Sequence, residues 1–333
     1  MESSKIMRRH KDNPIITAAD FPVPARAVFN CGQTMYNGQT ILLIAAFYKE
    51  EDRYGSITGI HVAKSDDGIH FKIEKEALCR KRAWAGECPG NFDCWVIDPR
   101  VTKIDDTYYI VRPAQAKPEG SADTGPAALL EKTKDFRTCE FVDCISLPSN
   151  RVPCLFPEKI DGYYVRLDRP YNLQDLASLP NSEEMACAGI WISYSPDLIF
   201  WGKHRPLVYP SSIPKYANWK MGPTPPIKTA YGWLEIIHGV NVDNGEFRYS
   251  IGAMLLDIEN PRKIIGVTDD PLLTPTEPYE THGWANNVVF TCGAIADTET
   301  DILRIYYGCA DTCIGLATGR LSKVIEACKR NKL

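Results

Sequence analysis

The chain has 333 residues, of which 44% are hydrophobic and 24% are charged, so it can fold around a substantial core. Its formal net charge of -4 offers no basic surface for nucleic acid or for an anionic membrane. No apolar run approaches the roughly 18 residues of a membrane helix, and the N-terminal residues lack the apolar core of a signal peptide. We therefore expect a soluble, cytoplasmic protein that binds neither nucleic acid nor membranes.

In chain order, five strand-like segments rich in Tyr, Ile, Val and Trp each follow a turn. They read YNGQTILLI from residue 36, IDDTYYIV from 104, IDGYYVRL from 160, AYGWLEII from 230 and ETDILRIYYG from 299, at intervals of 56 to 70 residues. Repeats of this length hold about four short strands and are typical of propeller blades. The pattern predicts an all-β, five-bladed β-propeller, with a β-sandwich or jelly roll as the alternative.

A second repeated element follows three of these segments. The stretches SDDGIHF from 65, TKDFRTCEF from 133 and SPDLIFWGKH from 195 each indicate a strand, a polar turn and an aromatic strand. Only the C-terminal stretch, at about 321–333, has a helical stripe, formed by Leu321, Val324, Ile325 and Cys328. We expect one catalytic domain over 1–333, with an N-terminal extension at about 1–12.

The twelve cysteines do not have the spacing of a metal site or of a disulfide framework. Cys309 and Cys313, for example, are too far apart for a CxxC pair, and no His lies at zinc-finger spacing beside such pairs. A disulfide framework belongs to small secreted chains. The cysteines are therefore expected to be reduced, and no metal is expected.

Polar residues stand beside the repeated strands at five places, where a propeller carries its functional loops. They are Asp98 in the tripeptide Asp-Pro-Arg, Asn150 with Arg151, Asp168 with Arg169, Lys220, and His238. Taken singly, each is more often a solvated charge, a turn former or a structural histidine. Together they supply two guanidiniums, an ammonium and an imidazole. That set suits an inorganic oxyanion, because the planar Arg side chain matches phosphate oxygens bidentately.

At these residues the chain resembles the family 130 glycoside phosphorylases, which are β-mannoside phosphorylases built on a five-bladed propeller. The matching motifs include SDDGIHF, DPRVTKIDDTYYI, LFPEKIDGYYVRLDRP, SPDLIFWGKHR, GWLEIIHGV, GAMLLDIENP and IYYGCADT, and they run along the whole chain. The resemblance implies inverting phosphorolysis of β-mannosides to α-mannose 1-phosphate. Inorganic phosphate would be the co-substrate, and no cofactor is implied.

The resemblance also assigns roles to the residues. Asp98 is implied as the catalytic acid, which protonates the glycosidic oxygen through the 3-hydroxyl of the mannose. An inverting glycosidase needs a second carboxylate to activate water, whereas phosphate arrives already anionic. The implied phosphate-binding residues are Asn150, Arg151, Arg169, Lys220 and His238, and the implied sugar-binding residues are Asp311 and Asn30.

The chain departs from the family pattern near the site. Ala45 and Ala46 stand where many relatives carry an Arg, and Arg53 is expected to substitute for it as a third substrate-binding residue. Ile97 and Ile237 precede Asp98 and His238. The acceptor sugar, the linkage and a possible homo-oligomer stay open. Two alternative functions remain: a β-mannoside hydrolase, which needs a second carboxylate, and a non-catalytic sugar-binding propeller, which needs no acid.

Overall fold

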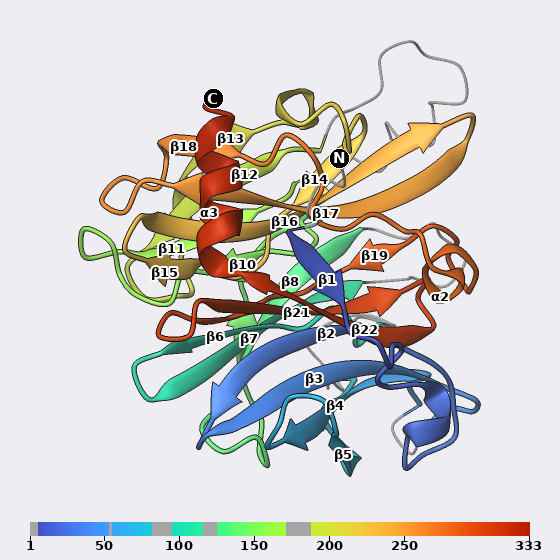
Figure 1. Cartoon of the computed structure of the whole chain (residues 1–333). Coiled ribbons are helices and arrows are strands. Elements are labelled where there is room, and N and C mark those ends of the chain that lie inside the picture. The colour runs from blue at the N-terminus through green and yellow to red at the C-terminus, as the bar shows by residue number, and fades with distance from the viewer. Residues whose placement is uncertain (1–5, 53–54, 82–94, 116–124, 171–187) are drawn as a thin grey trace.

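The computed structural model describes residues 6–52, 55–81, 95–115, 125–170 and 188–333. These residues form five antiparallel sheets arranged as the blades of a propeller (Figure 1). The first sheet contains β2 (Ala25–Tyr36), β3 (Gln39–Tyr48), β4 (Thr58–Ser65) and β5 (Lys72–Cys79). The second contains β6 (Arg100–Ile104), β7 (Thr107–Gln115), β8 (Pro126–Thr133) and β9 (Glu140–Cys144). The third contains β10 (Cys154–Leu155), β11 (Tyr164–Asp168), β12 (Ile190–Ser195) and β13 (Gly202–Val208).

The last two sheets have an additional strand each. The fourth contains β14 (Lys220–Gly222), β15 (Ile227–Thr229), β16 (Gly232–Asp243), β17 (Glu246–Leu256) and β18 (Ile264–Val267). The fifth contains β19 (Val289–Phe290), β20 (Ile295–Asp297), β21 (Ile302–Cys309), β22 (Cys313–Arg320) and the N-terminal β1 (Met7–Arg9). Because β1 pairs with β22, part of the segment expected as an N-terminal extension joins the two ends of the chain in one blade.

The repeats in the sequence coincide with the blades. The five turns lead into β3, β7, β11, β16 and β21, one strand of each sheet. In the second repeated element, Asp67, Asp135 and Asp197 each accept two backbone N–H bonds from the residues that follow, which closes the same polar turn in three blades. The five separate sheets confirm the five-bladed prediction.

Apolar side chains pack between neighbouring blades. Ile41 and Leu43 of the first sheet pack with Val101 and Ile110 of the second, and similar clusters join each following pair of sheets. A further cluster joins the fifth sheet to the first, so apolar contact continues around the ring. Burial of these side chains stabilises each blade against its neighbours by roughly 1.5–3 kcal/mol per large residue.

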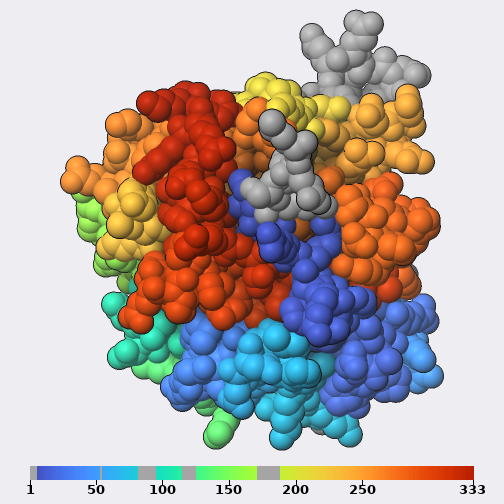
Figure 2. Space-filling view, viewed as in Figure 1, coloured from blue at the N-terminus to red at the C-terminus, as the bar shows by residue number. Residues whose placement is uncertain are grey.

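The helices are few and short among the described residues. The helix α3 (Leu321–Arg330) buries Leu321, Val324, Ile325 and Cys328, the four residues of the predicted stripe, and contacts β17, β18 and β22. Figure 2 shows it, in dark red, on the surface of the molecule. The other helical segments are η1 (Ala18–Asp20), η2 (Pro210–Ser212) and α2 (Pro278–Thr281). None of the described helices is long and apolar enough to cross a membrane.

Candidate active site

Asn30 and Asp98 owe their positions to unusual backbone conformations at strand irregularities. Asn30 lies at the register shift between Phe29 and Cys31 in the pairing of β2 with β3, and its φ is 44°. Asp98 stands just before β6 with a φ of 50°. Asn and Asp tolerate this left-handed region better than other side chains do, and bulges commonly redirect a side chain next to an active site. The two side chains therefore meet although 68 residues separate them.

Asp98 is almost completely buried, with 1% of its surface exposed, and both carboxylate oxygens are engaged. Asn30 Nδ2 donates to Oδ1 over 2.8 Å, and Arg151 donates to Oδ2 from Nη2 over 3.0 Å and from Nε over 3.3 Å. Arg100 donates from Nη1 to the backbone carbonyl of Asp98 over 3.0 Å. Two side chains far apart in the sequence, Asn30 and Arg151, thus hold one carboxylate, and Arg100 bonds its backbone.

These contacts decide the charge of Asp98. Burial by itself raises the pKa of the carboxyl, but Arg151, Arg100 and the hydrogen bond from Asn30 together hold the pKa below its usual value. In the anion-free protein Asp98 is therefore a carboxylate at neutral pH. A general acid must carry a proton, so this state is not yet the acid form.

Asp311 lies close to Asp98 in the turn between β21 and β22, with a φ of 50°. Burial, and then the charge of Asp98, raise its pKa to about 6, and Arg151 partly opposes this effect. The two carboxyl groups thus share one electrostatic environment. A pair of this kind is placed to accept hydrogen bonds from sugar hydroxyls.

Arg151 connects Asp98 to a cation cluster, which we define as Arg151, Arg169, Lys220 and His238. Nη1 of Arg169 lies 3.0 Å from Nε2 of the fully buried His238, whose ring packs 4.6 Å from the ring of Phe290. Gly222 leaves the space for this contact, because a Cβ there would stand 2.7 Å from His238 Nε2 and 3.1 Å from Arg169 Nη1.

The cation cluster is electrostatically strained. Burial, followed by the neighbouring Arg and Lys charges, lowers the pKa of His238 well below its usual value, so the imidazole is neutral. Burial, Arg169 and Arg151 likewise lower the pKa of Lys220 well below that of a free lysine. Like charges repel one another in a partly dehydrated site. A bound anion would relieve this repulsion.

Buried hydrogen bonds fix the cluster from behind. Asn150 accepts a bond from the backbone N–H of Arg169 over 3.0 Å and donates to Asp168 over 2.8 Å. Asp168 also accepts from Ser193 over 2.6 Å and forms a 2.7 Å ion pair with Arg166. Asn150 therefore contacts Arg169 and Asp168, and its side chain supports the position of the guanidinium.

An aromatic group borders the carboxyl groups. Phe47 lies 4.7 Å from Trp284 and 6.4 Å from Trp95, measured between ring centroids. Trp284 is 61% exposed, and its backbone N–H donates to Thr312, the residue after Asp311. Trp284 thus contacts the turn that carries Asp311, and Trp95 lies three positions before Asp98 in the sequence.

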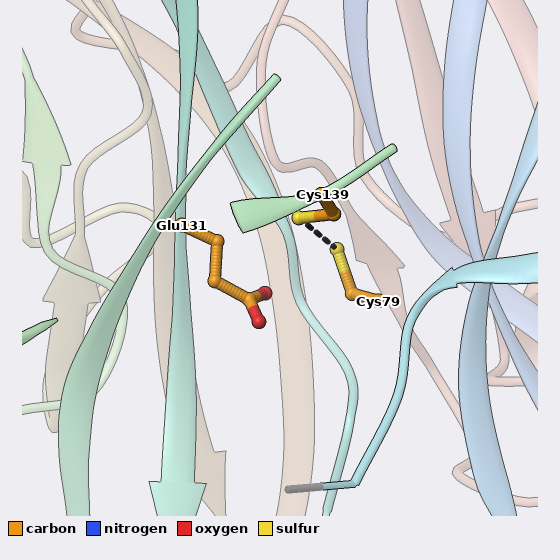
Figure 3. A group of neighbouring side chains, drawn as sticks. All are labelled: Cys79, Glu131 and Cys139. Atoms are coloured by element: carbon orange, nitrogen blue, oxygen red, sulfur yellow. Dashed lines mark hydrogen bonds between the residues drawn. The ribbon is translucent and has the colours of Figure 1, made fainter. Parts of the chain in front are cut away.

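One other group in the described part of the chain has metal-ligand side chains: Cys79, Cys139 and Glu131, between the first and second blades (Figure 3). The two Sγ atoms are 3.8 Å apart. Glu131, however, accepts a 2.9 Å bond from Arg112 in a buried ion pair. A carboxylate committed to a guanidinium is a poor metal ligand, so we read this group as a buried thiol contact beside an ion pair.

The structure brings eight of the nine predicted site residues into this constellation, whereas Arg53 lies outside the described residues. Sequence analysis did not identify Tyr249, Arg100 and Trp284 as site residues. The ring of Tyr249 lies 5.3 Å from Lys220 Nζ, although it belongs to a regular strand without a motif. Trp284 lies outside the repeated elements of the sequence, and its exposure became visible only in the structure.

Comparison with known proteins gives the same result along the whole chain. A family model described as beta-1,4-mannooligosaccharide phosphorylase, that of glycoside hydrolase family 130, matches residues 5–330. The chain belongs to glycoside hydrolase family 130. Two curated family 130 relatives are each 31% identical to it: a beta-1,4-mannooligosaccharide phosphorylase from Ruminococcus albus, aligned over 97% of this chain and 91% of the relative, and a beta-1,2-mannobiose phosphorylase from Listeria innocua, aligned over 96% and 97%.

Solved structures agree with the fold. The Listeria innocua beta-1,2-mannobiose phosphorylase in complex with beta-1,2-mannobiose superposes with a TM-score of 0.77 at 29% identity, covering 98% of this chain and 99% of that chain. A putative glycoside hydrolase from Parabacteroides distasonis has a TM-score of 0.72 at 21% identity, covering 95% and 96%. At that lower identity the second likeness concerns the fold alone.

Proposed function

We propose that the protein catalyses the inverting, reversible phosphorolysis of β-mannosides to α-mannose 1-phosphate and a shortened acceptor. The observation that carries the proposal is one buried carboxyl, Asp98, held beside a cation cluster that has the chemistry of a phosphate site. Phosphate attacks the anomeric carbon while Asp98 supplies a proton for the leaving oxygen, relayed through the 3-hydroxyl of the mannose. Asp311 and Asn30 bind the donor mannose.

Blade order supports an in-line arrangement of the reactants. The sugar-binding and acid residues Asn30, Asp98 and Asp311 come from the first, second and fifth blades. The cation cluster comes from the third and fourth blades and their connecting segments. Inversion requires nucleophile and leaving group on opposite faces of the anomeric carbon, so the acceptor sugar lies away from the cations. On that side stand the rings of Phe47, Trp95 and Trp284, whose apolar faces suit a sugar ring.

The hydrolase alternative needs a carboxylate base on the face opposite the acid. Two carboxyl groups are tested for this role: Asp168, which Asn150 joins to Arg169, and Glu235, which interacts with Arg100. Asp168 already accepts bonds from Asn150 and Ser193 and pairs with Arg166. Burial raises the pKa of Glu235 well above its usual value, which keeps it a neutral acid. Neither group can activate water, which favours phosphorolysis.

The decisive experiment compares the cleavage of β-1,2- and β-1,4-mannobiose with and without inorganic phosphate. Both linkages are included because the curated relatives act on both. We expect cleavage that depends on phosphate and releases one α-mannose 1-phosphate per mannose, detected by ³¹P NMR. Equal rates in phosphate-free buffer, with free mannose as the product, would identify a hydrolase instead.

A further inference from the structure

Arg151 is placed to bind either the Asp98 carboxylate or an anion at the cation cluster. Two of its nitrogens point at a single oxygen of Asp98, at 3.0 Å and 3.3 Å. It also belongs to the cation cluster, to which the proposed function assigns phosphate. Its side chain is 37% exposed, whereas that of Asp98 is 1% exposed. Arg151 thus stands between the buried carboxylate and the space that an anion would occupy.

We propose that Arg151 exchanges partners during catalysis: it binds the Asp98 carboxylate in the anion-free enzyme and turns to phosphate when phosphate binds, so that phosphate binding loads Asp98 with its proton. The inference rests on the proposed phosphorolysis and adds to it an order of events. Arg151 is a positioning residue for the acid and a ligand for the nucleophile in turn.

Electrostatic interactions explain why the exchange of partners favours protonation of Asp98. Asp98 loses an ion-pair partner and gains a neighbouring anion, and both changes favour the protonated carboxyl. One proton is taken up from solvent. It passes to the glycosidic oxygen as a phosphate oxygen bonds to the anomeric carbon and the bond between that carbon and the leaving oxygen breaks. The acceptor leaves with the proton, and Asp98 is again a carboxylate that can pair with Arg151.

Arg100, the other guanidinium at Asp98, is not suited to this exchange. It is 1% exposed, donates to the backbone carbonyls of Asp98 and Pro223, and its Cζ lies 5.7 Å from the centre of the Phe290 ring. Arg100 is therefore fixed, and only Arg151 combines access to the anion space with a bond to the acid. The planar guanidinium suits both partners, since carboxylate and phosphate offer similar pairs of oxygens.

Any test must distinguish proton uptake by Asp98 from proton uptake by the other titratable groups nearby. Those in electrostatic contact with Asp98 or with Arg151 are Arg100, Tyr249, Cys292, Asp311, Lys220 and His238. His238 and Lys220 can also take up protons when an anion arrives, because burial and neighbouring cations hold their pKa values low. The measurement must therefore compare variants.

The test is calorimetric titration with sulfate, a phosphate-like anion that does not itself titrate between pH 5 and 7. Repeating it in buffers of different ionisation enthalpy gives the number of protons taken up per anion bound. We expect the wild type to take up as much as about one proton more than Asp98→Asn. Arg151→Gln should lose this excess while binding sulfate more weakly, and Arg151→Lys, which keeps the charge, should restore part of it.

The outcomes separate the two proposals. Equal proton uptake in wild type and Asp98→Asn, with sulfate bound by both, overturns the partner exchange and leaves phosphorolysis intact. Full excess uptake in Arg151→Gln does the same, because the effect would then not require Arg151. Failure of both sulfate and phosphate to bind, together with phosphate-independent cleavage of mannobiose, overturns the proposed function and the exchange with it.

Discussion

Replacing Asp311 by Asn should stabilise the anion-free protein at neutral pH. Burial and the nearby charge of Asp98 raise the pKa of Asp311 from 3.8 to about 6. A carboxyl with a raised folded-state pKa costs stability above its unfolded pKa, and the cost is complete once pH exceeds the folded pKa. At 1.36 kcal/mol per unit, the ionised side chain costs about 3 kcal/mol at pH 7.

The expected change in melting temperature follows from the size of the chain. With about 2.1 cal/mol/K per residue, unfolding of 333 residues has an entropy of roughly 0.7 kcal/mol/K. A gain of about 3 kcal/mol therefore raises Tm by about 4 °C at pH 7. At pH 4 most of the folded-state carboxyl is already protonated, and the gain falls to about 0.5 kcal/mol.

Differential scanning calorimetry at pH 7 and pH 4 measures both values without phosphate or sugar. Asn occupies left-handed backbone as readily as Asp, so the φ of 50° at this position adds no strain. Asp243→Asn, on the exposed hairpin between β16 and β17, is the matched control and should change stability by less than about 0.5 kcal/mol. No rise in Tm at pH 7, or the same rise at pH 4, would refute the assignment of a partly buried, repelled anion.

Three further predictions concern catalysis. Asp98→Asn should lower phosphorolysis of mannobiose about 10²- to 10⁴-fold but affect a dinitrophenyl mannoside much less, and a full rate on mannobiose would mean that another group is the acid. Arg169→Ala should raise the KM for phosphate about 10- to 150-fold, the equivalent of about 1.5–3 kcal/mol, while the exposed Arg137→Ala should not; equal values would remove Arg169 from the phosphate site. Trp284→Ala should raise the KM for the acceptor in the synthetic direction with little change for mannose 1-phosphate, and Tyr231→Ala, another exposed aromatic, is its control. An unchanged acceptor KM in Trp284→Ala would place the acceptor elsewhere.

The blade architecture is encoded locally, which is why the sequence reveals it. Each blade repeats an Asp-, Asn- or Gly-containing turn and strands rich in aromatic and β-branched residues, and such signals depend on neighbours within a few positions. The helix stripe from Leu321 to Cys328 has the same local origin. The sequence also predicted the chemical types at the site, because Asp98, Arg169 and His238 belong to motifs that resemble those of the family.

The protonation states of those side chains depend on contacts that form only when the five blades close into a ring. The ion pair between Asp98 and Arg151 joins residues 53 positions apart. Asp311, which interacts with Asp98, lies near the C-terminal end of the chain. Sequence patterns do not report how far each carboxyl is buried or which cation reaches it. Those two quantities set the opposite pKa shifts of Asp98 and Asp311, because desolvation and Coulomb energies depend on distances of a few ångströms between different blades.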